Sequence, residues 1–356
     1  MSQSVIDVAL LSFGGPAEFG EIPAFMQRLT GGTPSAELLA FVDEKYRAIG
    51  GGSPLNAITE RQAAALEASL CGQLHAEVRV RPAYLHCEPT VAQVLGELDG
   101  ADVLALSLSP YSSRLTTGAY RKALADAGAS WVPVIEGWYS DPQFEQAVSE
   151  RVAQALDGRQ SSDYAVLFTA HSVPKETILE GDPYVEQIHE VIAHLLPAIM
   201  PGDWRLGWQS KGRRGGEWLE PSVEDVVLQL AAQGWQKLLV VPVGFIADNV
   251  ETLYDLDIVL KRVVHENGMN YLRSEPPNDS PRFIAVLADA VIGYLAHRPV
   301  EEAGNNTPAA VERRGRVAAV GAGDAAPNGA APNDAEPDSA GPNDAGPDDA
   351  GPAVAR

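Results

Sequence analysis

Short apolar runs alternate with longer amphipathic stretches over the first 300 residues of this 356-residue chain, and this alternation narrows the choice of folds most. The apolar runs have the length of buried strands: Val5–Phe13, Val78–Leu85, Val103–Leu108, Trp131–Ile135, Ala165–Thr169, Leu206–Gln209 and Lys237–Val243. The stretches between them show helical spacing: Ile58–Leu70, Phe144–Leu156, Pro183–Leu196, Val223–Ala232 and Arg282–Ala296. Alternation of this kind predicts an α/β fold with parallel sheets and helices on both faces.

The strand ends fall into two sets, one on each side of residue 140. VALLSFGGP and VLALSLSPYSS in the first set resemble AVLFTAHSVP and LLVVPVGFIADN in the second, because each strand runs into a small, polar loop. We therefore predict two similar α/β halves, residues 1–140 and 141–300. Open α/β sheets bind ligands at the carboxyl ends of their strands, so the site residues are sought in these four loops.

Residues 301–356 have a different composition from the rest, dominated by Ala, Gly, Pro, Asn and Asp. From residue 322 onward the prolines recur every five residues, which predicts a solvated tail because such a segment cannot bury a core. An acidic segment that binds a partner is the alternative. The chain carries 26 Lys and Arg against 48 Asp and Glu, a net charge of −22, which argues against nucleic acid as a partner.

Only two cysteines are present, Cys71 and Cys87, too few for a disulfide scaffold or an all-cysteine four-ligand metal site. This cysteine usage fits a reducing cytoplasm. The opening MSQSVIDVALL lacks the basic and longer apolar regions of an export signal. No window approaches the roughly 18 apolar residues of a spanning helix, so we expect no stable membrane insertion, with peripheral contact left open.

His171 directly follows the strand AVLFTA, which places an imidazole at the carboxyl end of a strand. This is an active-site position, although a loop histidine bonded only to backbone is the alternative. His86, in YLHCEPT, also ends a strand and is held in reserve.

In VVPVGFIADNVETLYDLD a strand and a loop lead into a helix that Asp248 is placed to cap. Glu251 and Asp255 are four residues apart, so both carboxylates lie on one face of that helix. Like charges at this spacing repel one another, and a third charge or a nearby cation would account for them. A solvated acidic face is the alternative.

Together His171 and Glu251 offer one nitrogen and one or two oxygens to a borderline metal such as Fe²⁺. An imidazole also accepts protons near neutral pH, and a carboxylate beside it can relay them. The sequence contains no HExxH, CxxC, GxSxG or P-loop motif, and the Gly14-Gly15 turn lacks dinucleotide-binding spacing.

Aromatic residues cluster near the expected strand ends, where flat side chains can sandwich a planar ligand. They are Phe13, Tyr111, Tyr120, Trp138, Trp208, Trp218, Phe245 and Tyr254. Packing in the core is the alternative for each of them. The segment Lys211–Arg214 forms a local positive patch suited to ligand carboxylates, or else a solvated loop.

The motifs LLSFGGP, YRAIGGGSPL, LFTAHSVP, GWQSKGRRGGEWLEP and PVGFIADNVETLYDLD, in this order and spacing, resemble those of ferrochelatases. The resemblance runs from about Val5 to Leu295. It implies two Rossmann-like halves flanking a porphyrin cleft, and insertion of Fe²⁺ into a porphyrin with release of two protons. It also implies that Fe²⁺ is a substrate and not a cofactor.

Carried over residue by residue, the resemblance implies a catalytic metal site at His171 and Glu251 and porphyrin contacts at Ser53 and Tyr120. Asp255 then lies on a possible proton or metal path.

The chain departs from the family pattern at several positions. Many members have a histidine where Asn249 stands, some have a metal-facing tyrosine at Phe13, and some have a further acid at Val259. Two cysteines cannot supply the four ligands of the [2Fe-2S] cluster that some relatives bind.

The resemblance is to the compact bacterial form of the family, which favours coproporphyrin III as substrate and a monomeric enzyme. The alternatives are a protoporphyrin IX ferrochelatase, a cobalt or nickel tetrapyrrole chelatase, and a haem-binding carrier without turnover. A binding protein of the periplasmic type also has two α/β halves, but the missing export signal argues against it.

Overall fold

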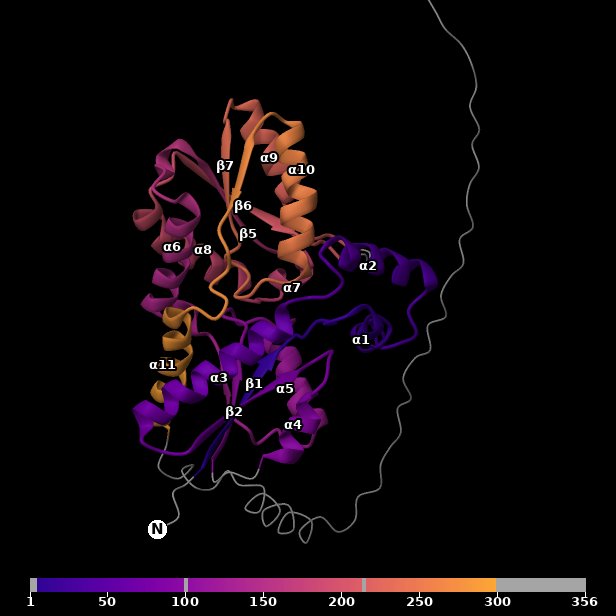
Figure 1. Cartoon of the computed structure of the whole chain (residues 1–356), viewed down its shortest axis with the longest axis vertical. Helices are drawn as coiled ribbons and strands as arrows, with labels where there is room; N and C mark the ends of the chain where they lie inside the picture. The colour runs from indigo at the N-terminus through magenta and orange to yellow at the C-terminus, as the bar shows by residue number, and fades with distance from the viewer. Residues whose placement is uncertain (1–4, 99–101, 213–215, 299–356) are drawn as a thin grey trace, which may run out of the picture. The chain divides into compact units, whose positions relative to one another are not determined.

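Two parallel four-stranded sheets form the framework of the protein (Figure 1). The computed structural model describes residues 5–98, 102–212 and 216–298. One sheet has the order β2-β1-β3-β4 and the other β6-β5-β7-β8. The strands are β1 (Ile6–Ser12), β2 (Val78–Tyr84), β3 (Asp102–Ser107), β4 (Val134–Ile135), β5 (Ala165–His171), β6 (Asp203–Gln209), β7 (Lys237–Val241) and β8 (Asn270–Arg273). Since the two orders are equivalent, the topology confirms two similar α/β halves.

Helices connect the strands and cover the sheets. They are α1 (Ile22–Thr30), α2 (Ala36–Ala48), α3 (Leu55–Leu74), α4 (Val91–Glu97), α5 (Thr117–Asp126), α6 (Pro142–Leu156), α7 (Lys175–Leu179), α8 (Tyr184–Ile199), α9 (Val223–Ala232), α10 (Lys261–Glu266) and α11 (Pro281–His297). A π-helix spans Glu251–Leu260 and runs directly into α10. Short 3₁₀ turns occur at Phe19–Glu21, Trp138–Ser140 and Ser161–Asp163. All five predicted helices are confirmed, and α9 agrees with its prediction at both ends.

Both faces of the central strands β1, β3, β5 and β7 are buried, as their uninterrupted apolar runs predicted, whereas the edge strands β2, β6 and β8 are partly exposed. In β1, Val8 and Leu10 enter a core shared with β5 and with α3, α6, α8 and α11, whereas Ala9 and Leu11 pack on the opposite face with α4 and α5. In the second sheet, α9, α10 and the π-helix cover the face that Leu167 enters. A strand with no solvent-facing side must be apolar throughout, which explains why alternation is missing from these runs.

Two strands are shorter than predicted because proline interrupts them. The expected strand Trp131–Ile135 begins only at Val134, since Pro133 has no N–H to donate to a neighbour. Pro133 still takes part through its carbonyl, which accepts the Ala105 N–H at 2.9 Å. Likewise β7 ends at Val241, before Pro242.

Helix α11 returns from the second half to pack against α3 of the first, as well as against α6 (Figure 1). At its end, both Nη atoms of Arg298 donate to Asp102 on β3, at 2.9 and 3.0 Å. The last described helix therefore ties the second half to the first. The division at residue 140 stays a prediction, and the tail predicted at 301–356 lies outside the described residues.

Within the described residues, no helix combines the length and apolar character needed to cross a bilayer. The loops after β1, β3, β5 and β7 follow the carboxyl ends of strands, and all four line one cleft. The cleft is therefore located where the sequence predicted it.

Candidate active site

The cleft is mainly apolar. Its cavity volume is about 370 Å³, within the range of about 300–1000 Å³ common for small-molecule sites. Of the described residues that line it, His171 and Glu251 are the ones with acidic or basic side chains other than tyrosine. The other lining groups are aromatic rings, aliphatic side chains, hydroxyls, one amide side chain and glycine backbone. Such a lining suits a large, flat, apolar ligand and concentrates charge at one point.

His171 and Glu251, predicted as partners, are brought together across a gap of 80 residues. The Nε2 atom of His171 lies 3.2 Å from Oε1 of Glu251, and the two side chains keep 38% and 30% of their surface exposed. His171 is the last residue of β5, and Glu251 is the first residue of the π-helix. A ligand in the cleft can therefore reach both atoms.

Both ring nitrogens of His171 face acceptors. The Nδ1–H donates to the Ser172 carbonyl at 2.6 Å, and Nε2 faces the Glu251 carboxylate. Burial lowers the pKa of His171, but the charge and hydrogen bond of Glu251 raise it more, and the pKa reaches about 9. The Ser172 carbonyl and the charge of Asp255 also raise this pKa. Near neutral pH the pair is thus an imidazolium next to a carboxylate, with Nδ1 held by backbone so that Nε2 points to its partner.

The backbone at Glu251 is fixed from two sides. Asn249 Oδ1 accepts the Glu251 N–H at 2.7 Å, and Gln209 Nε2 donates to the Glu251 carbonyl at 3.1 Å. The prediction that Asp248 caps this helix was wrong, since Asn249 satisfies the free N–H and Asp248 accepts the Thr252 hydroxyl instead. Gln209 was missed by the sequence analysis. Its signal in the sequence was its place at the end of the predicted strand Leu206–Gln209. In the structure it ends β6, in register with His171.

Asp255 has its own cationic partner. Lys45 Nζ of α2 lies 2.8 Å from Asp255 Oδ1, and the Ser210 hydroxyl donates to Oδ2 at 2.6 Å. The ammonium also lies over the rings of Phe41 and Tyr254, at 5.3 and 5.2 Å. The expectation that a nearby cation accounts for the two acids is confirmed: His171 pairs with Glu251, and Lys45 pairs with Asp255.

The predicted aromatic cluster divides into cleft and core. Phe13, Tyr111, Tyr120, Trp218 and Phe245 line the cleft. The other three were wrongly placed: Trp138 packs on Phe144 and Phe283, Trp208 packs on Tyr184, and Tyr254 lies beneath Lys45.

The sequence analysis missed three aromatic residues that line the cleft: Phe25, Tyr46 and Tyr184. Phe25 and Tyr46 lie on α1 and α2, which contribute to a separate small core. Their helical spacing is that of ordinary packing positions, so no signal distinguished them. Burial raises the pKa of Tyr46, and the charge of Glu251 adds to this rise, so its hydroxyl stays protonated.

Ser53 and Tyr120, implied as ligand contacts by resemblance, both line the cleft. Ser53 is held in place by its N–H, which donates to the Pro16 carbonyl at 2.8 Å. Tyr120 lies on α5, and burial raises the pKa of its hydroxyl. Both therefore present neutral hydrogen-bonding groups to a ligand.

The remaining residues singled out from the sequence do not add a metal ligand to the His171 and Glu251 pair. Phe13 and Asn249 line the cleft, and neither offers a strong metal ligand. His86 packs edge-on against Phe13, with ring centroids 4.5 Å apart, and burial lowers its pKa. Of the positive patch, Arg213 and Arg214 lie outside the described residues.

Among the described residues, no group of three or more His, Cys, Asp and Glu side chains is arranged to hold a metal ion. The His171 and Glu251 pair thus presents two protein ligands, which leaves other coordination positions to solvent or to a bound molecule.

Comparison with known proteins agrees with this geometry. Residues 7–294 match the family profile described as Ferrochelatase. The chain belongs to the ferrochelatase family. A coproporphyrin III ferrochelatase from Anoxybacillus flavithermus is 34% identical over 310 residues, covering 83% of this chain and 98% of the relative. A ferrochelatase from Geobacter sp. strain M21 is 36% identical over 279 residues, covering 76% of this chain and 86% of the relative.

A solved structure shares the fold of this ferrochelatase family member. DR2241 from Deinococcus radiodurans, described as a multi-domain protein with structural similarity to chelatases, superposes with a TM-score of 0.51 at 14% identity. The match covers 89% of this chain and 60% of that protein. It supports the two-half α/β architecture alone.

Proposed function

We propose that this ferrochelatase family member inserts Fe²⁺ into coproporphyrin III, with release of two protons, as a step of haem biosynthesis. The observation that carries the proposal is the pairing of His171 Nε2 with Glu251 at 3.2 Å in an otherwise uncharged, aromatic-lined cleft. A planar macrocycle fits the aromatic and glycine walls, and its centre is where a metal and two protons must be exchanged. The names of the relatives support the same reaction.

The lone pair on His171 Nε2 is proposed to serve two purposes, metal binding and proton transfer. Nε2 can coordinate Fe²⁺ or carry a proton, but it cannot do both at once, so arrival of the ion releases the Nε2 proton. As iron passes to the macrocycle, its two pyrrole protons must leave. The freed Nε2 of His171 can accept one of them and the Glu251 carboxylate the other, and both protons then pass to solvent. We propose that the two roles follow one another within a turnover, with the Nδ1 hydrogen bond to Ser172 holding the ring in place.

The macrocycle must expose its central nitrogens for iron to enter. Four aromatic residues that line the cleft are proposed to pack against the ring: Phe13, Tyr111, Trp218 and Phe245. We propose that contacts at the ring periphery supply the binding energy for a bent geometry. Ser53 and Tyr120 are proposed to receive carboxylates of the substrate, as hydroxyl donors. Asp255 is proposed to lie on a path for protons beyond Glu251. A metal ion bound there would have to displace Lys45 and Ser210, which already occupy its two oxygens.

The proposal of coproporphyrin III, in preference to protoporphyrin IX, rests on the names of the relatives. Several at 32–34% identity, spanning 98–100% of their length, are named coproporphyrin III ferrochelatases, whereas others are named only ferrochelatase. We further propose a cytoplasmic monomer without an iron–sulfur cluster. The two free cysteines, Cys71 and Cys87, fit this compartment, and two cysteines are too few to bind the cluster.

The test is anaerobic incubation with Fe²⁺ and either coproporphyrin III or protoporphyrin IX, while the free-base absorption is followed. The proposal predicts rapid loss of the coproporphyrin bands and slower loss of the protoporphyrin bands. Preference for protoporphyrin overturns the substrate and keeps the reaction. Turnover only with Co²⁺ or Ni²⁺ indicates another chelatase, and tight binding of metallated porphyrin without turnover indicates a carrier.

A further inference from the structure

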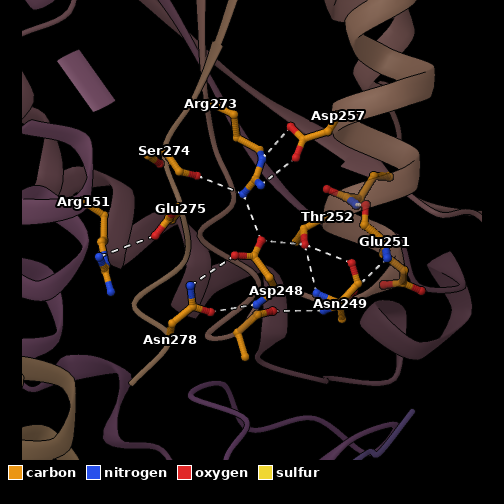
Figure 2. A network of polar contacts seen from close by, with 12 residues as sticks. Arg151, Asp248, Asn249, Glu251, Thr252, Asp257, Arg273, Ser274, Glu275 and Asn278 are labelled. Atoms are coloured by element: carbon orange, nitrogen blue, oxygen red, sulfur yellow. Dashed lines mark hydrogen bonds and ion pairs between the residues drawn. The ribbon is translucent and has the colours of Figure 1, made fainter. Parts of the chain in front are cut away.

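One arginine outside the cleft joins two acids that flank Glu251 in sequence. Arg273, the last residue of β8, donates from Nε and Nη2 to the two oxygens of Asp257, at 2.8 and 2.7 Å. Its Nη1 lies 3.2 Å from Asp248 Oδ1 (Figure 2). The Arg273 side chain is only 9% exposed. A buried guanidinium is always charged, so its two carboxylates are required partners.

The first acid organises the entrance to the π-helix. Asp248 accepts the Thr252 hydroxyl at 2.9 Å and the Asn278 side-chain amide at 3.1 Å. The Thr252 oxygen in turn accepts the Asn249 N–H at 3.0 Å, and Asn249 holds the Glu251 N–H. This chain of bonds leads from Asp248 through Thr252 and Asn249 to the backbone of Glu251, as Figure 2 shows.

The second acid lies further along the same helix. Asp257 is six residues beyond Glu251 and also accepts the Tyr271 hydroxyl at 3.1 Å. One side chain therefore anchors the π-helix both before and after Glu251. Rotation of this helix about its axis would break a bidentate ion pair between the buried guanidinium and the half-buried Asp257, a kind of contact that is among the stronger polar ones in proteins.

Rotation is also what would separate Glu251 from His171. The two groups lie on different elements, and their 3.2 Å contact depends on the direction in which the first turn of the π-helix presents its side chain. π-helical turns are rare and occur frequently at functional sites, and this one begins at Glu251 itself. Arg273, Asp257 and Asp248 are absent from the described cleft lining, so any effect they exert on a ligand there passes through the helix.

We propose that Arg273 is a positioning residue for Glu251. By binding Asp248 and Asp257 at the same time, Arg273 fixes the rotation of the π-helix about its axis. This inference deepens the proposed function, because the pair that it positions is the proposed metal site. Partners that orient a metal-binding group typically contribute 10- to 100-fold to metal affinity or activity. We expect the same range here.

The test is Arg273→Lys, which keeps the charge and loses the two-pronged contact. In protein labelled with ¹⁵N-histidine, without iron or porphyrin, we expect the Nε2 signal of His171 at pH 7 to shift away from its wild-type position. His171→Ala assigns the signal. In the iron-insertion assay we expect the KM for Fe²⁺ to rise about 10-fold or more while the KM for porphyrin stays within about twofold.

Asp257→Asn repeats the test with a milder change. The amide keeps the shape of the acid, so the variant weakens the contact of Arg273 with residue 257 and leaves its contact with Asp248 intact. It covers the case in which Arg273→Lys does not fold. Arg205→Lys is the matched control: Arg205 pairs with Asp203 at 2.6 Å near the start of β6, at a distance from Glu251 in the fold. The control should change neither the His171 signal nor the KM for Fe²⁺.

The outcomes separate the inference from the proposed function. An unchanged His171 signal in folded Arg273→Lys and Asp257→Asn, with only a lower melting temperature, assigns Arg273 to structural support and overturns the inference. A shifted signal in a protein that inserts no iron into any porphyrin keeps the positioning role and overturns the proposed function instead.

Discussion

The two halves share one sheet topology and differ in what their strand-end loops carry. In the first half, β1 ends at Ser12 and leads into Phe13-Gly14-Gly15, and Gly14 adopts a φ of +81° with Tyr84 and Cys87 packed against it. In the second half, the equivalent strand β5 ends at His171. A side chain at Gly14 would be strained as well as crowded, since a Cβ there would meet both neighbours at 3.1 Å.

This difference indicates a division of labour. Among the described lining residues, the first half supplies backbone, aromatic rings and hydroxyls that a macrocycle can lie against. The second half adds the aromatic rings of Tyr184, Trp218 and Phe245, and it alone supplies the imidazole and the carboxylate. The same framework can therefore bind in one half and carry reactive groups in the other, because strand-end loops change without altering the sheets. The predictions below test this division, from the largest effect to the smallest.

Removing the imidazole of the reactive pair should greatly lower turnover and leave porphyrin binding intact. We expect His171→Ala to lower kcat by about 10²- to 10⁴-fold, the range for loss of a general base, while coproporphyrin III still binds. Fluorescence quenching measures binding, and loss of free-base absorption measures kcat. His194→Ala, which changes a half-exposed surface histidine paired with Glu145, is the control. A His171→Ala enzyme with near wild-type kcat would remove this residue from the mechanism.

Iron binding should strengthen as pH rises. The pKa of His171 is raised to about 9, so below that pH the proton competes with the metal for Nε2. Between pH 6.5 and 8.5 the unprotonated fraction grows roughly 50- to 100-fold, and kcat/KM for Fe²⁺ should rise with it. Measurement is anaerobic, at saturating porphyrin. A flat profile over this interval would contradict the ion-pair state.

Loss of hydroxyls from the first half should affect the porphyrin and not the metal. A hydrogen bond to a charged group contributes about 1.5–3 kcal/mol, so Ser53→Ala and Tyr120→Phe should each raise the KM for coproporphyrin III about 10-fold or more. The KM for Fe²⁺ should stay within about twofold in both variants. An equal rise in both constants would show that the halves do not divide the work.

Breaking the contact of Lys45 with Asp255 should give the smallest change in rate. The pair is largely buried, with 23% and 16% of the side chains exposed, so Lys45→Met should lower the free energy of unfolding by about 1–3 kcal/mol. Turnover should fall only a few-fold, because Ser210 still holds Asp255 and the His171 and Glu251 pair is intact. Urea unfolding and kcat are the two measurements. A loss of kcat as large as that of His171→Ala would make Lys45 part of the chemistry.

The sequence was most informative where local pattern and global fold agree. Apolar runs predicted β1 to β7, whereas the short, largely polar strand β8 was missed. His171 was placed at the sheet edge because it directly follows a buried strand. Glu251 followed from the spacing of two acids that need a cation.

The sequence was least informative where long-range packing decides. Trp138 and Trp208 have the same local signal as Trp218, and only tertiary contacts show which of them reach the cleft. Nothing in the local pattern distinguishes a π-helix from an α-helix at Glu251–Leu260. Arg273 sits 22 residues from Glu251 on a short strand, and only the fold reveals that it grips both sides of that helix.

Single-turnover mixing tests the central claim most directly. The enzyme is first saturated with coproporphyrin III without metal, then mixed anaerobically with Fe²⁺ in a stopped-flow spectrometer. The account predicts conversion of bound free-base porphyrin in the wild type, and persistence of the bound free-base spectrum in His171→Ala. Equal conversion in both proteins, or no conversion in the wild type, would contradict it.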